Sequence, residues 1–112
     1  MKEKNVIVEK SYVFALRIVK LFRYLSTEKK EYHLSKQVIR SGTSIGANVE
    51  EAAMAGSSRN DFKAKLDIAH KEARETRFWL KLLRDSKILV PNAANSILNS
   101  KIYKKQSLLK NY

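Results

Sequence analysis

Apolar residues recur along this chain at intervals of three and four, which is the spacing that brings side chains onto one face of an α-helix. The pattern divides into four segments joined by short polar stretches, and no stretch shows the long alternation of a half-buried strand. The sequence therefore predicts an all-α fold, an antiparallel up-down four-helix bundle in which residues 1–112 form a single domain.

The first predicted helix runs from about Val6 to Leu25 and carries two apolar stripes side by side. Together they cover roughly 220° of its circumference, well beyond the 100° or somewhat more that faces a single core. We expect this helix to contact both its own core and a neighbouring subunit. The two stripes consist of Tyr12, Ala15, Leu16, Val19 and Phe22, and of Phe14, Ile18, Leu21 and Leu25.

The second predicted helix begins after Ser35, a good N-cap residue, and is rich in small residues over the stretch SGTSIGANVEEA, residues 41–52. Gly42 and Gly46 lie four apart on one side of it, and each costs about 1 kcal/mol of helix propensity relative to alanine. The favoured interpretation is close packing against another helix, taken to be the third; the alternative is a backbone pocket for a ligand. Asn48 falls on the core stripe, where a polar side chain can fix the register of packing.

The third predicted helix runs to about Arg84. Gly56 is suited to the left-handed cap that ends the preceding helix, and Ser58 with Asp61 resembles a capping box. The short connection makes the second and third helices antiparallel. The core stripe of the third helix is Phe62, Leu66, Ala69, Ala73, Thr76, Leu80 and Leu83.

The last predicted helix is weaker. Pro91 fits its first position, and its partial apolar stripe is Ala94, Ile97, Leu98, Ile102, Leu108 and Leu109.

The charge balance indicates the kind of partner. Lys and Arg number 23 against 11 Asp and Glu, a formal net charge of +12. Such a balance favours RNA, DNA or an acidic protein, although a lysine-rich surface can also serve solubility alone. The chain has no cysteine, no apolar run of the roughly 20 residues needed to span a membrane, and no signal-peptide pattern at its N-terminus. The expected location is the cytoplasm.

No set of residues suggests catalysis, and the predicted class is a non-enzyme without cofactor or metal. His33 and His70 do not form the paired Glu-x-x-His motifs of di-metal bundles. The glutamates Glu50, Glu51, Glu72 and Glu75 have basic residues near them in the sequence or expected across from them, and salt bridges account for them without chemistry.

Basic residues with helical spacing are the candidate functional site. Arg74, Arg77, Lys81 and Arg84 share one face of the third helix, and Lys10, Arg17 and Lys20 line the polar arc of the first. Such rows would contact phosphates and supply affinity without reading bases. Phe78 and Trp79 could stack on bases, but packing in the core or at an interface is the favoured interpretation of this pair.

The stretch SGTSIGANVEEA, the pattern Ser58-x-x-Asp61-Phe62 and the stretch KLDIAHKEARETRFWLKLL, residues 65–83, resemble the bacterial four-helix-bundle family related to the 23S rRNA intervening-sequence protein. The resemblance implies a homopentamer, and it extends to an accessory protein of diversity-generating retroelements, which binds a reverse transcriptase and nucleic acid. It implies no catalytic residue. Many relatives carry proline in place of Gly46 and glycine in place of Ala52. The function expected from charge and resemblance together is non-specific RNA or DNA binding by an oligomeric accessory factor; the alternative is a ring-shaped protein scaffold.

Overall fold

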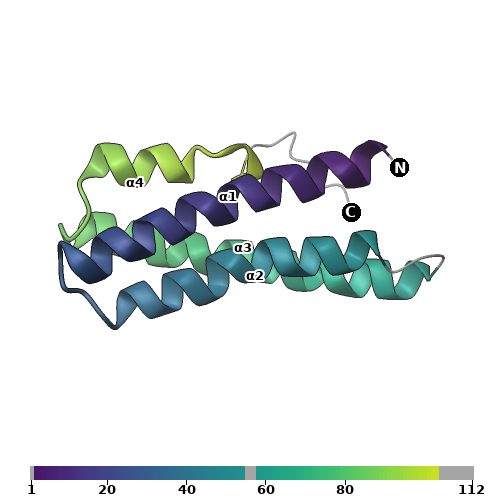
Figure 1. The fold of residues 1–112 in the computed structure, drawn as a ribbon, viewed down its shortest axis with the longest axis horizontal. Helices are drawn as coiled ribbons and strands as arrows, with labels where there is room; N and C mark the ends of the chain where they lie inside the picture. Colours follow the sequence, from purple (N-terminus) through teal and green to yellow (C-terminus); the bar gives the residue numbers. More distant parts are fainter. Residues whose placement is uncertain (1, 55–57, 104–112) are drawn as a thin grey trace.

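The computed structural model describes residues 2–54 and 58–103, which form four α-helices and a short 3₁₀ helix; no strand occurs in these two segments. Successive α-helices run in opposite directions, so the predicted up-down four-helix bundle is confirmed (Figure 1). The elements are α1 (Lys2–Thr27), α2 (Leu34–Ala53), α3 (Arg59–Asp85), α4 (Pro91–Leu98) and the 3₁₀ helix η1 (Lys101–Tyr103).

The core lies between the three long helices, and α4 with η1 covers part of it. On α1 only one of the two apolar stripes is fully used: Phe14 and Ile18 are buried, whereas Tyr12 and Leu16 of the other stripe are exposed. Full burial of each large apolar side chain contributes about 1.5–3 kcal/mol. The buried residues of α3 are Leu66, Ala69, Ala73, Thr76, Leu80 and Leu83, with Phe62 packed against them, as its spacing predicts.

The two glycines of α2 permit close packing, as expected. The helix that they pack against is α1, whereas the sequence analysis expected α3. A β-carbon at Gly42 would lie 2.8 Å from both γ-carbons of Ile18. One at Gly46 would lie 3.3 Å from the backbone oxygen of Ser11. On α3, Ile68 is exposed and does not pack against the small residues of α2. The glycines therefore allow α1 and α2 to approach each other.

A buried hydroxyl pair joins α2 to α3. The Thr76 hydroxyl lies 2.8 Å from the Ser41 hydroxyl, which itself lies 3.0 Å from the backbone oxygen of Gln37. Asn48 does not bridge helices, because its amide donates to the backbone and hydroxyl oxygens of Ser44 on its own helix. Val49 takes the buried position next to it. The buried polar contact between α2 and α3 is therefore made by the hydroxyls.

The starts of the helices differ in how they are capped. Ser58 caps α3 as predicted, its hydroxyl accepting the Asp61 amide at 3.2 Å. Ser35 does not cap α2, because this helix begins one residue earlier, at Leu34. The backbone amide of Ser35 donates to a carboxylate oxygen of Glu31 at 3.0 Å. The buried hydroxyl of Ser35 has no partner within the described segments. Gly56 lies outside the described residues.

The fourth helix is shorter than predicted. Pro91 occupies its start, as expected, but the helix ends at Leu98 and the chain continues into η1. Ala94 and Ile97 of α4 and Ile102 of η1 are buried. The predicted positions Leu108 and Leu109 lie outside the described residues.

Candidate functional site

The basic residues of α1 lie along the edge that this helix shares with α4 and η1. Arg17 and Lys20 line a surface cavity together with Val90 and Ala93 at the start of α4. Lys10 and Arg17 line a second cavity whose other wall includes Lys101 of η1. The three cations therefore follow the length of α4 and η1, over about 15 Å of helix.

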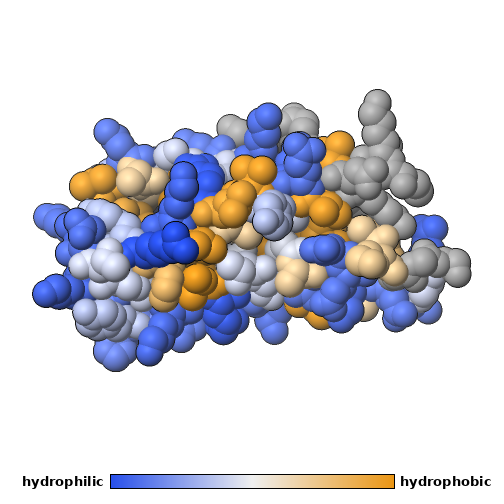
Figure 2. All heavy atoms as spheres, in the orientation of Figure 1, coloured by the Kyte–Doolittle hydropathy of each residue, from blue (hydrophilic) through white to orange (hydrophobic). Residues whose placement is uncertain are grey.

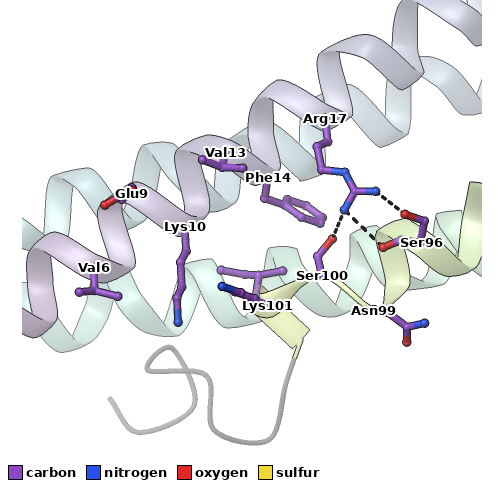
Figure 3. A pocket seen from close by; sticks show the side chains of 11 residues that line it. Val6, Glu9, Lys10, Val13, Phe14, Arg17, Ser96, Asn99, Ser100 and Lys101 are labelled. Carbon is purple, nitrogen blue, oxygen red and sulfur yellow. Dashed lines mark hydrogen bonds between the residues drawn. The ribbon is translucent and has the colours of Figure 1, made fainter.

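Arg17 also joins α1 to α4. Its guanidinium donates to the Ser100 hydroxyl at 2.8 Å, to the Ser96 hydroxyl at 2.8 Å and to the Ser96 backbone oxygen at 3.3 Å (Figure 3). These acceptors are neutral, so the positive charge of Arg17 is not compensated by them. Arg17 therefore has a structural role in addition to its contribution to the positive surface.

The basic row of α3 borders the other side of α4 and η1. Arg84 donates to the Asn95 side chain of α4 at 3.1 Å and to the neighbouring Asp85 at 2.8 Å. The hydrogen bond between Arg84 and Asp85 raises the pKa of Arg84 and lowers that of Asp85. Near η1, burial raises the pKa of Tyr103 well above its usual value, which the charge of Arg77 partly opposes.

Both predicted rows thus have members beside α4 and η1, namely all three cations of α1 and, on α3, Arg77 and Arg84, and the sequence spacing alone did not show this. We call the two rows and the surface between them the basic face. It consists of Lys10, Arg17 and Lys20 on α1 and Arg74, Arg77, Lys81 and Arg84 on α3. Two of these seven interact with a carboxylate, Asp85: Arg84 pairs with it, and the charge of Lys81 lowers its pKa; the other five have no carboxylate partner within the described segments.

Three of the four glutamates that drew attention in the sequence lie elsewhere, in ion pairs between α2 and α3, whereas Glu50 forms no ion pair within the described segments. Arg40 of α2 pairs with both Glu72 and Glu75, a partner that the sequence did not predict. Lys65 pairs with Glu51 at 3.1 Å, in agreement with the expectation. Apart from Glu72, whose side chain is 12% exposed, the paired side chains are well exposed, and exposed pairs contribute little stability each. They therefore do not offset the positive charge of the basic face, where Asp85 is the carboxylate that pairs with one of the cations, Arg84.

Two groups of apolar side chains remain exposed. On α1, Tyr12 is 62% and Leu16 is 50% exposed, and Figure 2 shows hydrophobic surface gathered over the middle of this helix. On α3, Phe78 is 58% exposed and lies edge-on to Trp79, with the ring centroids 5.1 Å apart. Trp79 packs against the core, as expected, whereas Phe78 does not, and its packing at an interface stays a prediction.

No group of three or more potential metal ligands occurs among the described residues. None of the helices in the described part of the chain is both long enough and apolar enough to cross a membrane.

The fold and the basic face define a small, positively charged, all-α bundle protein. The model of the 23S rRNA-intervening sequence protein family matches residues 3–110, and the chain belongs to this family. It is 48% identical to a protein of unknown function from the S23 ribosomal protein family of Bacteroides thetaiotaomicron, whose crystal structure has a TM-score of 0.90 to this one. That match covers 97% of this chain and 96% of the other. No curated protein matches the chain.

Proposed function

We propose that this protein is a non-enzymatic, cytoplasmic, oligomeric accessory factor that binds RNA or DNA through the phosphates. The observation that carries the proposal is the basic face, whose two rows both have members beside α4 and η1 and in which only Arg84 and Lys81, both near Asp85, interact with a carboxylate in the described segments. Uncompensated cations along a surface bind a phosphate backbone by releasing its counterions. The family description also names 23S rRNA.

The oligomer part of the proposal rests on α1. Tyr12 and Leu16 lie one helical turn apart, and at least half of each side chain is exposed. Their neighbours Phe14 and Ile18 are in the core. Exposed apolar side chains grouped in this way are typical of interaction surfaces. A second copy of the chain is the proposed partner, and the resemblance described above makes a pentamer the expected assembly.

A protein scaffold is the second candidate function. The exposed Phe78 and its neighbour Leu82 on α3 favour it, because they give a protein partner apolar area beside the cations Arg77 and Lys81. An acidic protein would fit this combination.

Fluorescence anisotropy with labelled RNA and DNA, across a salt series, tests the proposed function, and light scattering on the same samples gives the oligomer mass. Binding that weakens steeply with salt and depends little on sequence is the expected result. An intact oligomer that binds neither polymer at low salt would contradict nucleic-acid binding and favour the scaffold. A mass of 12.9 kDa at micromolar concentration would contradict the oligomer.

A further inference from the structure

A cavity of about 470 Å³ separates α1 from η1 and the end of α4 (Figure 3). Its size lies within the range of small-molecule sites. Phe14 and Ile102, both buried, lie beneath it, and Val13 of α1 lines it with half of its side chain exposed. We call this cavity the α1–η1 groove. None of its residues except Lys10 and Arg17 was singled out by the sequence as a candidate for binding.

The groove is positively charged. Lys10 enters it from α1 and Lys101 from η1, and Figure 3 shows the Lys10 side chain extending from α1 toward η1. Arg17 closes one end, held by its hydrogen bonds to the two serines. The one carboxylate among the lining residues, Glu9, is not paired with Lys10 or Lys101. Three cations against one carboxylate select for an anionic ligand.

The groove also offers oriented hydroxyl donors. Ser96 and Ser100 each accept a hydrogen bond from Arg17 at 2.8 Å, and neither hydroxyl donates to another group of the described segments. A hydroxyl has one proton to donate, so both protons are available to acceptors on a ligand. An aliphatic acid would use the apolar floor and the lysines but leave these donors unused. A nucleotide uses all three features, because its base has apolar faces and acceptor atoms and its phosphate is anionic.

We infer that the α1–η1 groove binds one nucleotide of an unpaired strand, with the base against Val6 and Val13 and the phosphate on Lys10 and Lys101. This inference rests on the proposed function and makes it more specific. A base inside a duplex is stacked and paired and cannot enter the groove, so the groove adds affinity for single strands only. Duplexes are then held by the phosphate contacts of the basic face alone.

Methyl NMR on the full chain tests the groove directly, with adenosine monophosphate as the probe. The nucleotide should shift the methyl signals of Val6, Val13 and Ile102, and adenosine and inorganic phosphate should each bind about tenfold more weakly, a loss of about 1.4 kcal/mol. Equal binding of nucleotide and inorganic phosphate would overturn the inference. If the same methyl signals shift when the protein is diluted without ligand, the groove is occupied by a second copy, and the inference is overturned. It is also overturned if the spectra show another segment of the same chain in contact with these methyl groups.

Variants separate the groove from the basic face. Val13→Phe fills the groove at a half-exposed position, and Ile68→Phe is a matched control at an exposed position of α3. Val13→Phe and Lys101→Gln should each weaken nucleotide binding about tenfold, whereas Ile68→Phe should not. Val13→Phe should also weaken single-stranded RNA binding while leaving duplex RNA binding unchanged. Equal effects on the two polymers would overturn the inference.

The two proposals fail in different ways. Polymer binding without any methyl shift by the nucleotide would overturn the groove and leave the proposed function standing. Methyl shifts by the nucleotide without binding of any polymer would overturn the proposed function and leave a nucleotide site.

Discussion

Gly42 of α2 lies directly against Ile18 of α1, so closely that a β-carbon on the glycine would come within 2.8 Å of both γ-carbons of Ile18. Ile18 is fully buried, and its β-branched side chain has little rotamer freedom in a helix. It cannot turn away from an added methyl group. The approach of α1 and α2 therefore depends on the absence of a side chain at this position, which accounts for a glycine in the middle of a helix.

The first prediction is that Gly42→Ala destabilises the protein although alanine is the better helix former. Overpacking costs about 1–3 kcal/mol, which exceeds the gain of about 1 kcal/mol in propensity. Gly42→Leu should abolish cooperative folding. Gly46→Ala is the comparison, because its nearest neighbour lies at 3.3 Å, and it should be close to neutral. Urea unfolding followed by circular dichroism measures all three; a Gly42→Ala variant as stable as the parent would refute the close packing.

The second prediction concerns the buried hydroxyl pair Ser41 and Thr76, whose oxygens are 2.8 Å apart. Thr76→Val should lower the free energy of unfolding by about 1 kcal/mol, and Ser41→Ala by a similar amount, because each leaves its partner with one hydrogen bond fewer. The double variant should cost less than the sum, since no buried hydroxyl is then left behind. Strict additivity in this double-mutant cycle would show that the two hydroxyls do not interact.

The third prediction is a loss of stability at high pH that involves Tyr103. Its phenol is buried, donates to the Ala73 backbone oxygen at 2.9 Å, and has a raised pKa. An unfolded tyrosine titrates near pH 10, so above that pH the unfolded state has lost a proton that the folded state keeps, and stability falls. The contribution is fully present below about pH 10.

Tyr103→Phe should therefore make the decline above about pH 10 shallower, while costing about 1 kcal/mol near neutral pH through the missing hydrogen bond. Tyr12→Phe is the control at an exposed tyrosine and should leave the pH profile unchanged. Unfolding measured from neutral pH to about pH 11 compares the three proteins. Parallel profiles for the parent and Tyr103→Phe would contradict the assignment.

The fourth prediction separates the two roles of Arg17. Arg17→Lys keeps the charge, but an ammonium cannot reproduce the planar set of bonds to Ser96 and Ser100. The variant should accelerate amide hydrogen exchange in α4 while leaving the salt dependence of RNA binding unchanged. If exchange in α4 stays slow, Arg17 does not hold this helix in place.

The helical period of the sequence was enough to predict the four helices and their buried faces, including Phe14 and Ile18 on α1. It was not enough to predict which neighbour each face meets. Gly42 was assigned to the third helix because that helix follows in the chain, yet α2 lies between α1 and α3 and its glycines face α1. A period states which side of a helix is buried, and the choice of neighbour depends on how three helices share one core.

For the candidate site, too, the sequence predicted the face of each helix but not its neighbours. The spacing of Arg77 and Lys81 predicted a shared helix face, but the placement of α4 between the two basic rows depends on tertiary contacts such as that of Arg17 with Ser96. Those contacts join residues 79 positions apart. The α1–η1 groove has no sequence motif, because apolar residues such as Val13 look like ordinary members of a helix stripe.

The central claim is that the basic face binds phosphates, and the salt dependence of RNA affinity tests it most directly. The double variant Arg77→Gln and Lys81→Gln should bind RNA more weakly than the parent. Its log–log salt slope should be shallower by about 0.9 for each duplex phosphate that the variant no longer neutralises, or about 0.7 on single strands.

Lys36→Gln with Lys71→Gln removes the same charge at exposed positions outside the basic face, and this control should retain the parental slope. Light scattering should show the same mass for all three proteins. If the salt slope becomes equally shallow in both double variants while the oligomer mass is unchanged, the basic face is not the surface that binds phosphates.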